Sequence, residues 1–352
     1  DEHPLSNVPP EPPPSRATMA SMSGMSHDAA SHDAGSLHPP PATGLVFDHE
    51  YRRHDPGPGH PESPDRYLAL SEAFRKSGIL SSAVRIPPRM AGKDDIHLAH
   101  TRPYWKTVLH DVARKADRLS TGDTSLGEHT LETALLAAGG ALSAVDAVFE
   151  GRVRNAFAAV RPPGHHATAS RGMGFCVFNS VAIAARYAQK VYGVDRVLIV
   201  DFDVHHGNGT QEIFYSDHSV LFFSTHQWPW YPGTGAADET GEGAGTGYTI
   251  NCPFPAGSGH AEILGAFRKK LLPAALDFKP SLVLVSAGFD SRRGDPLGRF
   301  TLRDSDFADI TSILMEIASA SASGRLVSIL EGGYNINGLA KAAQAHFEAL
   351  RA

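Results

Sequence analysis

Short apolar runs alternate with longer segments of helical periodicity from Thr43 to the end of the chain. Runs rich in β-branched and other apolar residues predict strands over 44–47, 156–160, 196–204, 219–225, 281–287 and 325–330. Segments with a helical period predict helices near 131–150, 177–192, 261–276 and 305–322. Continuous apolar stretches at 197–200 and 282–285 indicate strands buried on both faces. The pattern predicts a three-layer α/β/α domain around a central, mainly parallel sheet, with its site at the carboxyl ends of the strands.

The first 42 residues have a different composition. They are rich in Pro, Ser, Ala, Met and His and show no sustained apolar period. This composition predicts a flexible tail over 1–42, followed by one catalytic domain over 43–352. The methionines and histidines of the tail could bind a soft metal ion, but a plain low-complexity linker is the favoured interpretation.

Charge and apolar content exclude several classes of partner. With a formal net charge of -6 and a pI of about 6.3, the chain has no general attraction for a nucleic-acid backbone or an anionic membrane. We therefore expect no direct nucleic-acid binding. No stretch reaches the roughly 18 to 20 uninterrupted apolar residues of a membrane span, so no membrane association is expected. Association into a homo-oligomer stays open.

Cysteine usage bears on the compartment. Cys176 and Cys252 are too few for a disulfide framework or a four-cysteine metal site. They favour a reducing compartment and therefore a cytoplasmic location. Because the chain begins at Asp1 and not at Met, an exported or organellar location with a removed leader stays open.

The segment Asp201-Phe202-Asp203-Val204-His205 follows a predicted buried strand. Alternate residues of an extended chain share a face, so we expect Asp201, Asp203 and His205 to project together from the strand end. A divalent cation is the simplest compensation for this charge, and a loop of solvated acids and histidines is the alternative. Asp290 follows the strand 281–287, so Asp203, His205 and Asp290 would leave a fourth position open for water, as in a catalytic zinc site. The same donors would accept Fe(II) or Co(II).

Two further strand ends carry candidate catalytic groups. Arg161-Pro162-Pro163-Gly164 presents His165 and His166 from a stiff turn, which suits a general base and a general acid. Gly332-Gly333 precedes Tyr334, whose phenol could donate a hydrogen bond to a developing oxyanion. A lone loop histidine or a Gly-Gly-Tyr turn is usually structural, so the argument depends on their combination at one edge of the sheet.

Taken together, these segments resemble the zinc-dependent histone deacetylase family of the arginase-deacetylase fold, especially its class II-like and bacterial amidohydrolase branch. The resemblance covers the chain from about residue 44 to its end. It is carried by the motifs RPPGHHA (161–167), GFCVFN (174–179), DFDVHHGNGTQ (201–211), YPGTG (231–235), SAGFDSRRGDPLG (286–298) and EGGYN (331–335).

The resemblance implies roles for the residues of these motifs. Asp203, His205 and Asp290 would bind one zinc ion, His165 and His166 would contact the zinc-bound water, and Tyr334 would polarise the scissile carbonyl. Asp201 would orient His165 and, with Ser224 and nearby backbone carbonyls, would hold a structural potassium ion. Asn208 stands where some relatives carry an aspartate facing the second histidine. With this neutral partner, His166 is the easier of the two to deprotonate and is the expected base.

The resemblance also implies a substrate class. Phe175 and Tyr231 match the aromatic walls of the family's acyl-lysine tunnel, and Gly174 would offer its carbonyl to the substrate amide N–H. Leu297 stands where relatives specialised for polyamines place a glutamate, which favours acetyl-lysine in a peptide or protein over an acetylpolyamine or another small acylated amine. A two-metal ureohydrolase would need additional bridging aspartates around the strand ends, which this sequence lacks. A silent acyl-lysine binding module would need a lost ligand or tyrosine, and every such position is filled.

Overall fold

The computed structural model describes residues 42–352. The predicted tail over 1–42 lies outside these residues, apart from Ala42. The described chain builds one sheet of eight strands in the order β2-β1-β3-β8-β7-β4-β5-β6, and every neighbouring pair is parallel. The strands are β1 Thr43–Val46, β2 Val84–Arg85, β3 Asn155–Ala158, β4 Val197–Asp201, β5 Val220–Gln227, β6 Thr249–Phe254, β7 Leu282–Ala287 and β8 Leu326–Leu330.

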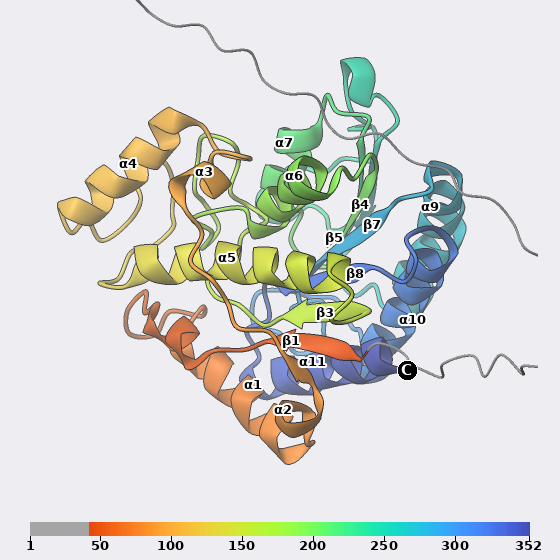
Figure 1. Ribbon diagram of the computed structural model, residues 1–352, viewed down its shortest axis with the longest axis horizontal. Coiled ribbons are helices and arrows are strands. Elements are labelled where there is room, and N and C mark those ends of the chain that lie inside the picture. Colours follow the sequence, from red (N-terminus) through yellow and green to blue (C-terminus); the bar gives the residue numbers. More distant parts are fainter. Residues whose placement is uncertain (1–41) are drawn as a thin grey trace, which may run out of the picture. The chain divides into compact units, whose positions relative to one another are not determined.

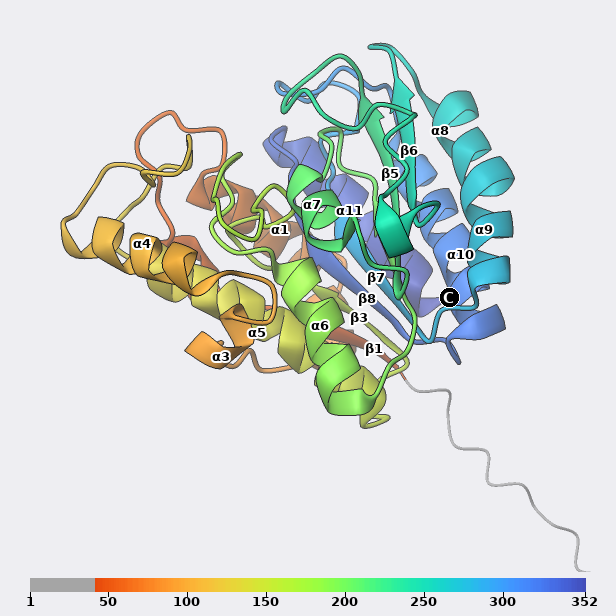
Figure 2. The ribbon, with the colours of Figure 1, turned by 90° about the horizontal axis from the view of Figure 1, so that it is seen from above.

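Helices cover both faces of this sheet (Figures 1 and 2). The long helices α5 (Thr130–Phe149) and α6 (Ser180–Tyr192) pack together on one face, and α1 (Pro64–Lys76), α10 (Asp304–Ser321) and α11 (Ile336–Arg351) lie on the other. The three-layer α/β/α class predicted from the sequence is therefore confirmed. The remaining helical segments are α2 Ile79–Ser82, α3 Lys93–Ile96, α4 Arg102–Ala113, α7 Asn208–Phe214, α8 His260–Ala266, a π-helical turn Phe267–Leu271, α9 Leu272–Phe278 and the 3-10 turns His49–Arg53 and Gly243–Gly245.

The helix α5 is the most apolar helix of the fold. Within residues 42–352 it alone has the length and hydropathy to cross a membrane, and 72% of its most apolar window is buried inside the fold. Small residues at its centre allow this burial, because a Cβ added at Gly139 would lie 1.8 Å from the carbonyl oxygen of Arg89. The helix is therefore a core helix that packs closely against neighbouring backbone.

All six predicted strands are present, but their bounds and number needed correction. The strand predicted over 196–204 ends at Asp201 because Phe202 and Val204, although apolar, are buried in the turn that follows it. The edge strands β2 and β6 were missed, as were the helices α1, α4 and α11. The strand β2 has only two residues, and β6 contains Asn251 and Pro253, so neither gives the continuous apolar signal of the central strands.

A buried histidine makes the core sensitive to acid. His346 of α11 is fully buried between Thr311 and Ser328, whose hydroxyls lie 2.6 and 2.8 Å from its ring nitrogens. Burial lowers the pKa of His346 from 6.5 to about 3. Below pH 6.5, His346 therefore binds a proton in the unfolded chain but not in the folded one. The free energy of unfolding falls as the pH drops from 6.5 toward 3.

Replacing His346 with glutamine should remove this contribution. The amide can still hydrogen-bond both hydroxyls but does not titrate, so the pH dependence of the free energy of unfolding should weaken by up to about 1.4 kcal/mol per pH unit below about pH 6. Urea unfolding of both proteins at several pH values between about 4 and 7 measures the slope. Equal slopes would show that His346 does not carry the effect.

Candidate active site

Four adjacent strands deliver the candidate residues to one place. In the sheet order β3-β8-β7-β4, the carboxyl end of β3 leads to His165 and His166, that of β8 to Tyr334, that of β7 to Asp290, and that of β4 to the segment of Asp203. Parallel strands end at the same edge, so residues more than a hundred positions apart become neighbours. The convergence predicted from the sequence is confirmed for these segments.

Asp203, His205 and Asp290 form a buried cluster at this edge. Their potential ligand atoms all lie within 4.8 Å of one another. Nδ1 of His205 lies 3.0 Å from Oδ1 of Asp203 and 3.2 Å from Oδ2 of Asp290. Backbone amides fix the carboxylates, because Val204 N–H donates to Asp290 Oδ1 and Gly332 N–H donates to Asp203 Oδ2. Glycine is required at 332, where a Cβ would lie 2.2 Å from Asp290 Oδ2.

The electrostatics of this cluster favour a bound cation. Burial, reinforced by the charge of Asp203, raises the pKa of Asp290 to about 7. Although burial opposes ionisation, His165 and His205 hold the pKa of Asp203 well below its usual range. The two carboxylates outweigh burial at His205 and raise its pKa to about 10. Asp290 Oδ2 is fully buried and accepts no hydrogen bond of good geometry from the described residues, although Nδ1 of His205 lies 3.2 Å away. Two buried carboxylates and an imidazole that converge in this way fit a divalent metal ion such as zinc.

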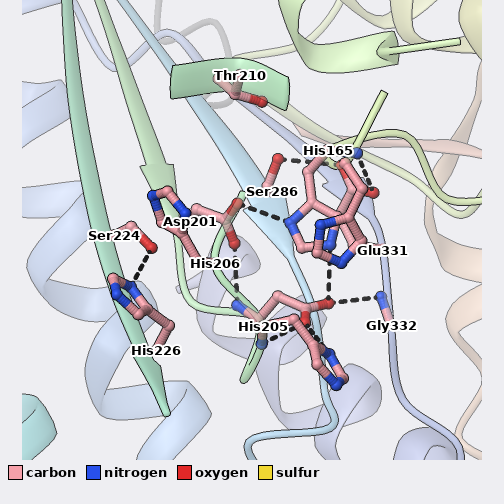
Figure 3. Close-up of polar contacts among 12 residues, drawn as sticks. His165, Asp201, His205, His206, Thr210, Ser224, His226, Ser286, Glu331 and Gly332 are labelled. Atoms are coloured by element: carbon pink, nitrogen blue, oxygen red, sulfur yellow. Dashed lines mark hydrogen bonds and ion pairs between the residues drawn. The ribbon is translucent and has the colours of Figure 1, made fainter. Parts of the chain in front are cut away.

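The local backbone differs from the extended segment expected at 201–205. After Asp201 the chain bends, so that Asp203 N–H donates to Asp201 Oδ1 at 3.1 Å and His205 N–H donates to Asp203 Oδ1 at 2.9 Å. Asp203 and His205 face Asp290. Asp201 Oδ2 lies instead 2.8 Å from Nδ1 of His165 (Figure 3). The predicted grouping of Asp203 with His205 is present, but the prediction is wrong for Asp201 and for the extended backbone, because side-chain-to-backbone hydrogen bonds shape a turn after Asp201.

The tandem histidines have different partners. Their rings lie 4.0 Å apart, with Nδ1 of His166 2.8 Å from Oδ1 of Asn208 and Nδ1 of His165 against the Asp201 carboxylate. Burial opposes the charged form of both. At His165 the charges of Asp201, Asp203 and Glu331 outweigh burial and hold the pKa well above its ordinary value. At His166 burial and the neighbouring His165 lower the pKa well below its ordinary value. A neutral His166 beside a charged His165 is the expected state.

Glu331 joins the loop that carries His165 and His166 to the end of β8. It is buried, its Oε2 accepts from the N–H groups of Gly164 and His165, and its Oε1 accepts from the Ser286 hydroxyl (Figure 3). Sequence reasoning treated Glu331 only as part of a turn. Its role in fixing the position of His165 required the fold.

A cavity of about 290 Å³ leads from the surface to the cluster of Asp203, His205 and Asp290. All four predicted substrate-binding residues, Gly174, Phe175, Tyr231 and Leu297, line it together with His166, His205 and Tyr334. The ring of Phe175 lies edge-on to that of Tyr334 at 5.8 Å, and the Tyr334 N–H donates to Asp295 Oδ2 at 2.7 Å. A larger surface cavity of about 590 Å³, lined by Tyr248 and Phe278 among others, lies at the amino ends of β5 and β6 and contains none of the predicted residues.

Comparisons with known proteins decide the family. The model of the histone deacetylase domain matches residues 60–350. This chain belongs to the histone deacetylase family. A probable deacetylase of Archaeoglobus fulgidus is 40% identical over 84% of this chain and 82% of its own length. The polyamine deacetylase HDAC10 of Danio rerio is 41% identical over 84% of this chain but only 45% of its own length. The crystal structure of the HDA15 HD domain superposes with a TM-score of 0.83 at 38% identity, covering 88% of this chain and 89% of that one.

The fold and the family confirm the resemblance drawn from the motifs, and this protein is a deacetylase that acts on amide bonds. Some relatives are much longer than this chain. Histone deacetylase 6 of Caenorhabditis elegans is 42% identical over 83% of this chain, but the match spans only 32% of that protein's length. The activity of such a whole relative does not transfer by similarity alone.

Sequence reasoning missed a residue at the mouth of the deacetylase cavity. Asp123, from the loop between α4 and α5, accepts a hydrogen bond from Gly174 N–H at 2.8 Å and one from the Tyr231 hydroxyl at 3.2 Å. It therefore links the two predicted walls of the cavity. Trp230, also missed, donates its indole N–H to the carbonyl of Leu297. Asp123 lies in a short polar loop with no spacing signal, so the sequence offered nothing to single it out.

The residues predicted for a monovalent cation are neighbours in the sheet. Asp201 of β4 pairs in register with Ser224 of β5, and both side chains are fully buried. The Ser224 hydroxyl lies 2.9 Å from Nδ1 of His226, while the Asp201 carboxylate contacts His165 and the Asp203 N–H (Figure 3). The potassium site stays a prediction.

Proposed function

We propose that this deacetylase is zinc-dependent and removes the acetyl group from the ε-amino group of acetyl-lysine in a peptide or protein, by direct attack of water. The buried cluster of Asp203, His205 and Asp290 at the base of a narrow cavity carries the proposal. The aromatic walls Phe175 and Tyr231 suit a linear alkyl chain.

Asp203, His205 and Asp290 would hold one zinc ion, and iron(II) or cobalt(II) suits the same donors. When bound, the ion supplies Lewis acidity toward the substrate carbonyl and toward water. The remaining chemistry belongs to the protein. His166 donates its Nδ1–H to Asn208, which leaves Nε2 free to take a proton from the attacking water. The Tyr334 hydroxyl donates to the developing oxyanion. His166 then gives its proton to the departing amine, and acetate and free lysine are released.

His165 has a supporting part in this scheme. Asp201 holds it in the charged form at 2.8 Å, so its role is to stabilise negative charge and to orient the neighbouring ring, while the lower pKa of His166 suits the base. A structural potassium ion at Asp201 and Ser224 with backbone carbonyls belongs to the same proposal. The free, buried Cys176 and Cys252 support a reducing, cytoplasmic location.

An acetylpolyamine is the second candidate substrate, since several relatives are named polyamine deacetylases. The residues at the cavity mouth favour acetyl-lysine. Leu297 offers no charge to a second amine, and the Asp123 carboxylate is already engaged by Gly174 N–H and the Tyr231 hydroxyl. Measuring kcat/KM for an acetyl-lysine peptide and for N-acetylputrescine tests the order. A clear preference for N-acetylputrescine would reverse it.

Replacing Leu297 with glutamate should shift this preference. A carboxylate at the mouth attracts the free amine of a polyamine, and we expect the ratio of kcat/KM for N-acetylputrescine over acetyl-lysine peptide to rise about tenfold, the equivalent of roughly 1.4 kcal/mol. Leu297→Gln is the uncharged control. An equal rise in both variants would attribute the effect to cavity shape and not to charge.

A further inference from the structure

A fully buried carboxylate lies behind the active site, outside every motif quoted from the sequence. Glu62 precedes α1 and contacts two fully buried arginines. Its Oε1 lies 2.7 Å from Nη1 of Arg66 and 2.6 Å from Nε of Arg161, and its Oε2 lies 2.8 Å from Nη2 of Arg161. His54 Nε2 adds a contact at 3.2 Å. Two buried guanidinium groups therefore depend on one anion.

Arg66 links the Glu62 carboxylate to the tyrosine turn, which is the segment Glu331-Gly332-Gly333-Tyr334. Its Nη2 donates to the carbonyl of Glu331 and its Nε to that of Gly333, both at 2.6 Å. These carbonyls flank the Gly332–Gly333 peptide unit, directly before Tyr334, and the guanidinium carbon lies 5.0 Å from the Tyr334 ring centroid. One planar guanidinium thus fixes the turn and supports the ring from which the phenol projects.

Arg161 links the same carboxylate to the histidine loop, which is the segment 162–166. It immediately precedes the turn that presents His165 and His166, and its remaining N–H groups donate to the carbonyls of Tyr51 and His54 at 2.8 and 3.1 Å. The base of the histidine loop and the tyrosine turn are therefore both held by the Glu62 carboxylate, whose Oε1 contacts both arginines. The tyrosine turn, with its two glycines, is the side with more freedom to move.

We propose that Glu62 is a positioning residue of the deacetylation reaction, whose carboxylate holds Arg66 against the Glu331 and Gly333 carbonyls and so fixes the Tyr334 phenol. The inference rests on the oxyanion role given to Tyr334 under the proposed function. Without the Glu62 charge, two adjacent buried guanidinium groups repel each other and lack an anionic partner, so Arg66 moves away from the carbonyls and the phenol loses its fixed position.

A double-mutant cycle with Tyr334→Phe tests this chain of contacts. In the wild-type background, Glu62→Gln should lower kcat by about 10²-fold, the loss expected from a displacement of about 1 Å, with little change in KM. In the Tyr334→Phe background it should lower kcat by less than about threefold, because residues that act as a unit are not additive. Zinc content should stay at the wild-type value in all variants, since Glu62 touches none of the proposed ligands.

Matched variants separate positioning from folding. Asp217→Asn removes a carboxylate that pairs with Arg186 at 2.6 Å before β5, at the opposite end of the sheet, and should leave kcat unchanged in both backgrounds. If Glu62→Gln does not fold, Glu62→Asp retains the charge with one methylene less reach, and the same cycle applies to it. Thermal unfolding reports the stability of each variant.

Two outcomes would count against different statements. Equal losses of kcat on changing Glu62 in the wild-type and Tyr334→Phe backgrounds would overturn the positioning role and leave the proposed function standing. A wild-type kcat in Tyr334→Phe itself would refute the oxyanion role in the proposed function, and the positioning role with it.

Discussion

Asp290→Asn should reduce deacetylation to background, a loss of at least about 10³-fold, because the Lewis acid that it removes is worth several kcal/mol. Asparagine has nearly the shape of aspartate, and Asp290 Oδ1 already accepts the Val204 N–H, so the turn after β7 should remain folded. What disappears is the second carboxylate charge facing His205. Zinc content by elemental analysis should therefore fall together with acetate release.

Asp309→Asn is the matched control for this variant. His260, Asp306 and Asp309 form a second group of side chains with metal-type spacing, and two of its three members are exposed. Removing the exposed Asp309 should change neither zinc content nor kcat. Zinc that is lost from Asp309→Asn and retained by Asp290→Asn would move the metal to the surface group.

Tyr334→Phe should lower kcat by about 10²- to 10³-fold, the usual cost of removing one oxyanion donor. The ring should stay in place, because the Tyr334 N–H is held by Asp295 and the ring packs against Phe175 and under Arg66. KM for an acetyl-lysine peptide should change little, since the donor acts mainly on charge that develops in the transition state.

Tyr231→Phe is the comparison for this second prediction. Tyr231 lines the same cavity, but its hydroxyl donates to Asp123 at the mouth and does not point toward the proposed zinc ligands. Its loss should affect kcat by less than about tenfold, because this hydrogen bond lies at the exposed mouth of the cavity and not at the reacting atoms. Equal losses in Tyr231→Phe and Tyr334→Phe would show that the phenol of Tyr334 has no special part in the chemistry.

The central strands and the metal-type cluster were predictable because their signals are local. The strands β4 and β7 begin as continuous apolar runs, and each is followed closely by an acidic residue, so the parallel arrangement of these strands brings Asp203 and Asp290 to one edge. The difference in partner between His165 and His166 was expected from the family resemblance, which implies Asp201 beside the first histidine and Asn208 beside the second. The structure places both partners as expected.

The supporting contacts were not predictable because they depend on long-range packing. Arg66 and Gly333 are 267 positions apart in the chain, and nothing in the segment around Glu62 differs from an ordinary helix-start sequence. Asp123 reaches Gly174 from another loop, 51 positions away. The helix α11 was missed although its sequence has an amphipathic pattern, whose apolar face buries Leu339 and Phe347 in the core.

The most direct test of the account is to strip the purified protein of metal with a chelator, restore zinc, and follow acetate release from an acetyl-lysine peptide. We expect activity to vanish on chelation and to return when about one zinc ion is bound per chain, with Asp290→Asn unresponsive to the same treatment. Undiminished acetate release from protein shown by elemental analysis to be zinc-free, or a requirement for two zinc ions per chain, would contradict a single catalytic zinc at Asp203, His205 and Asp290.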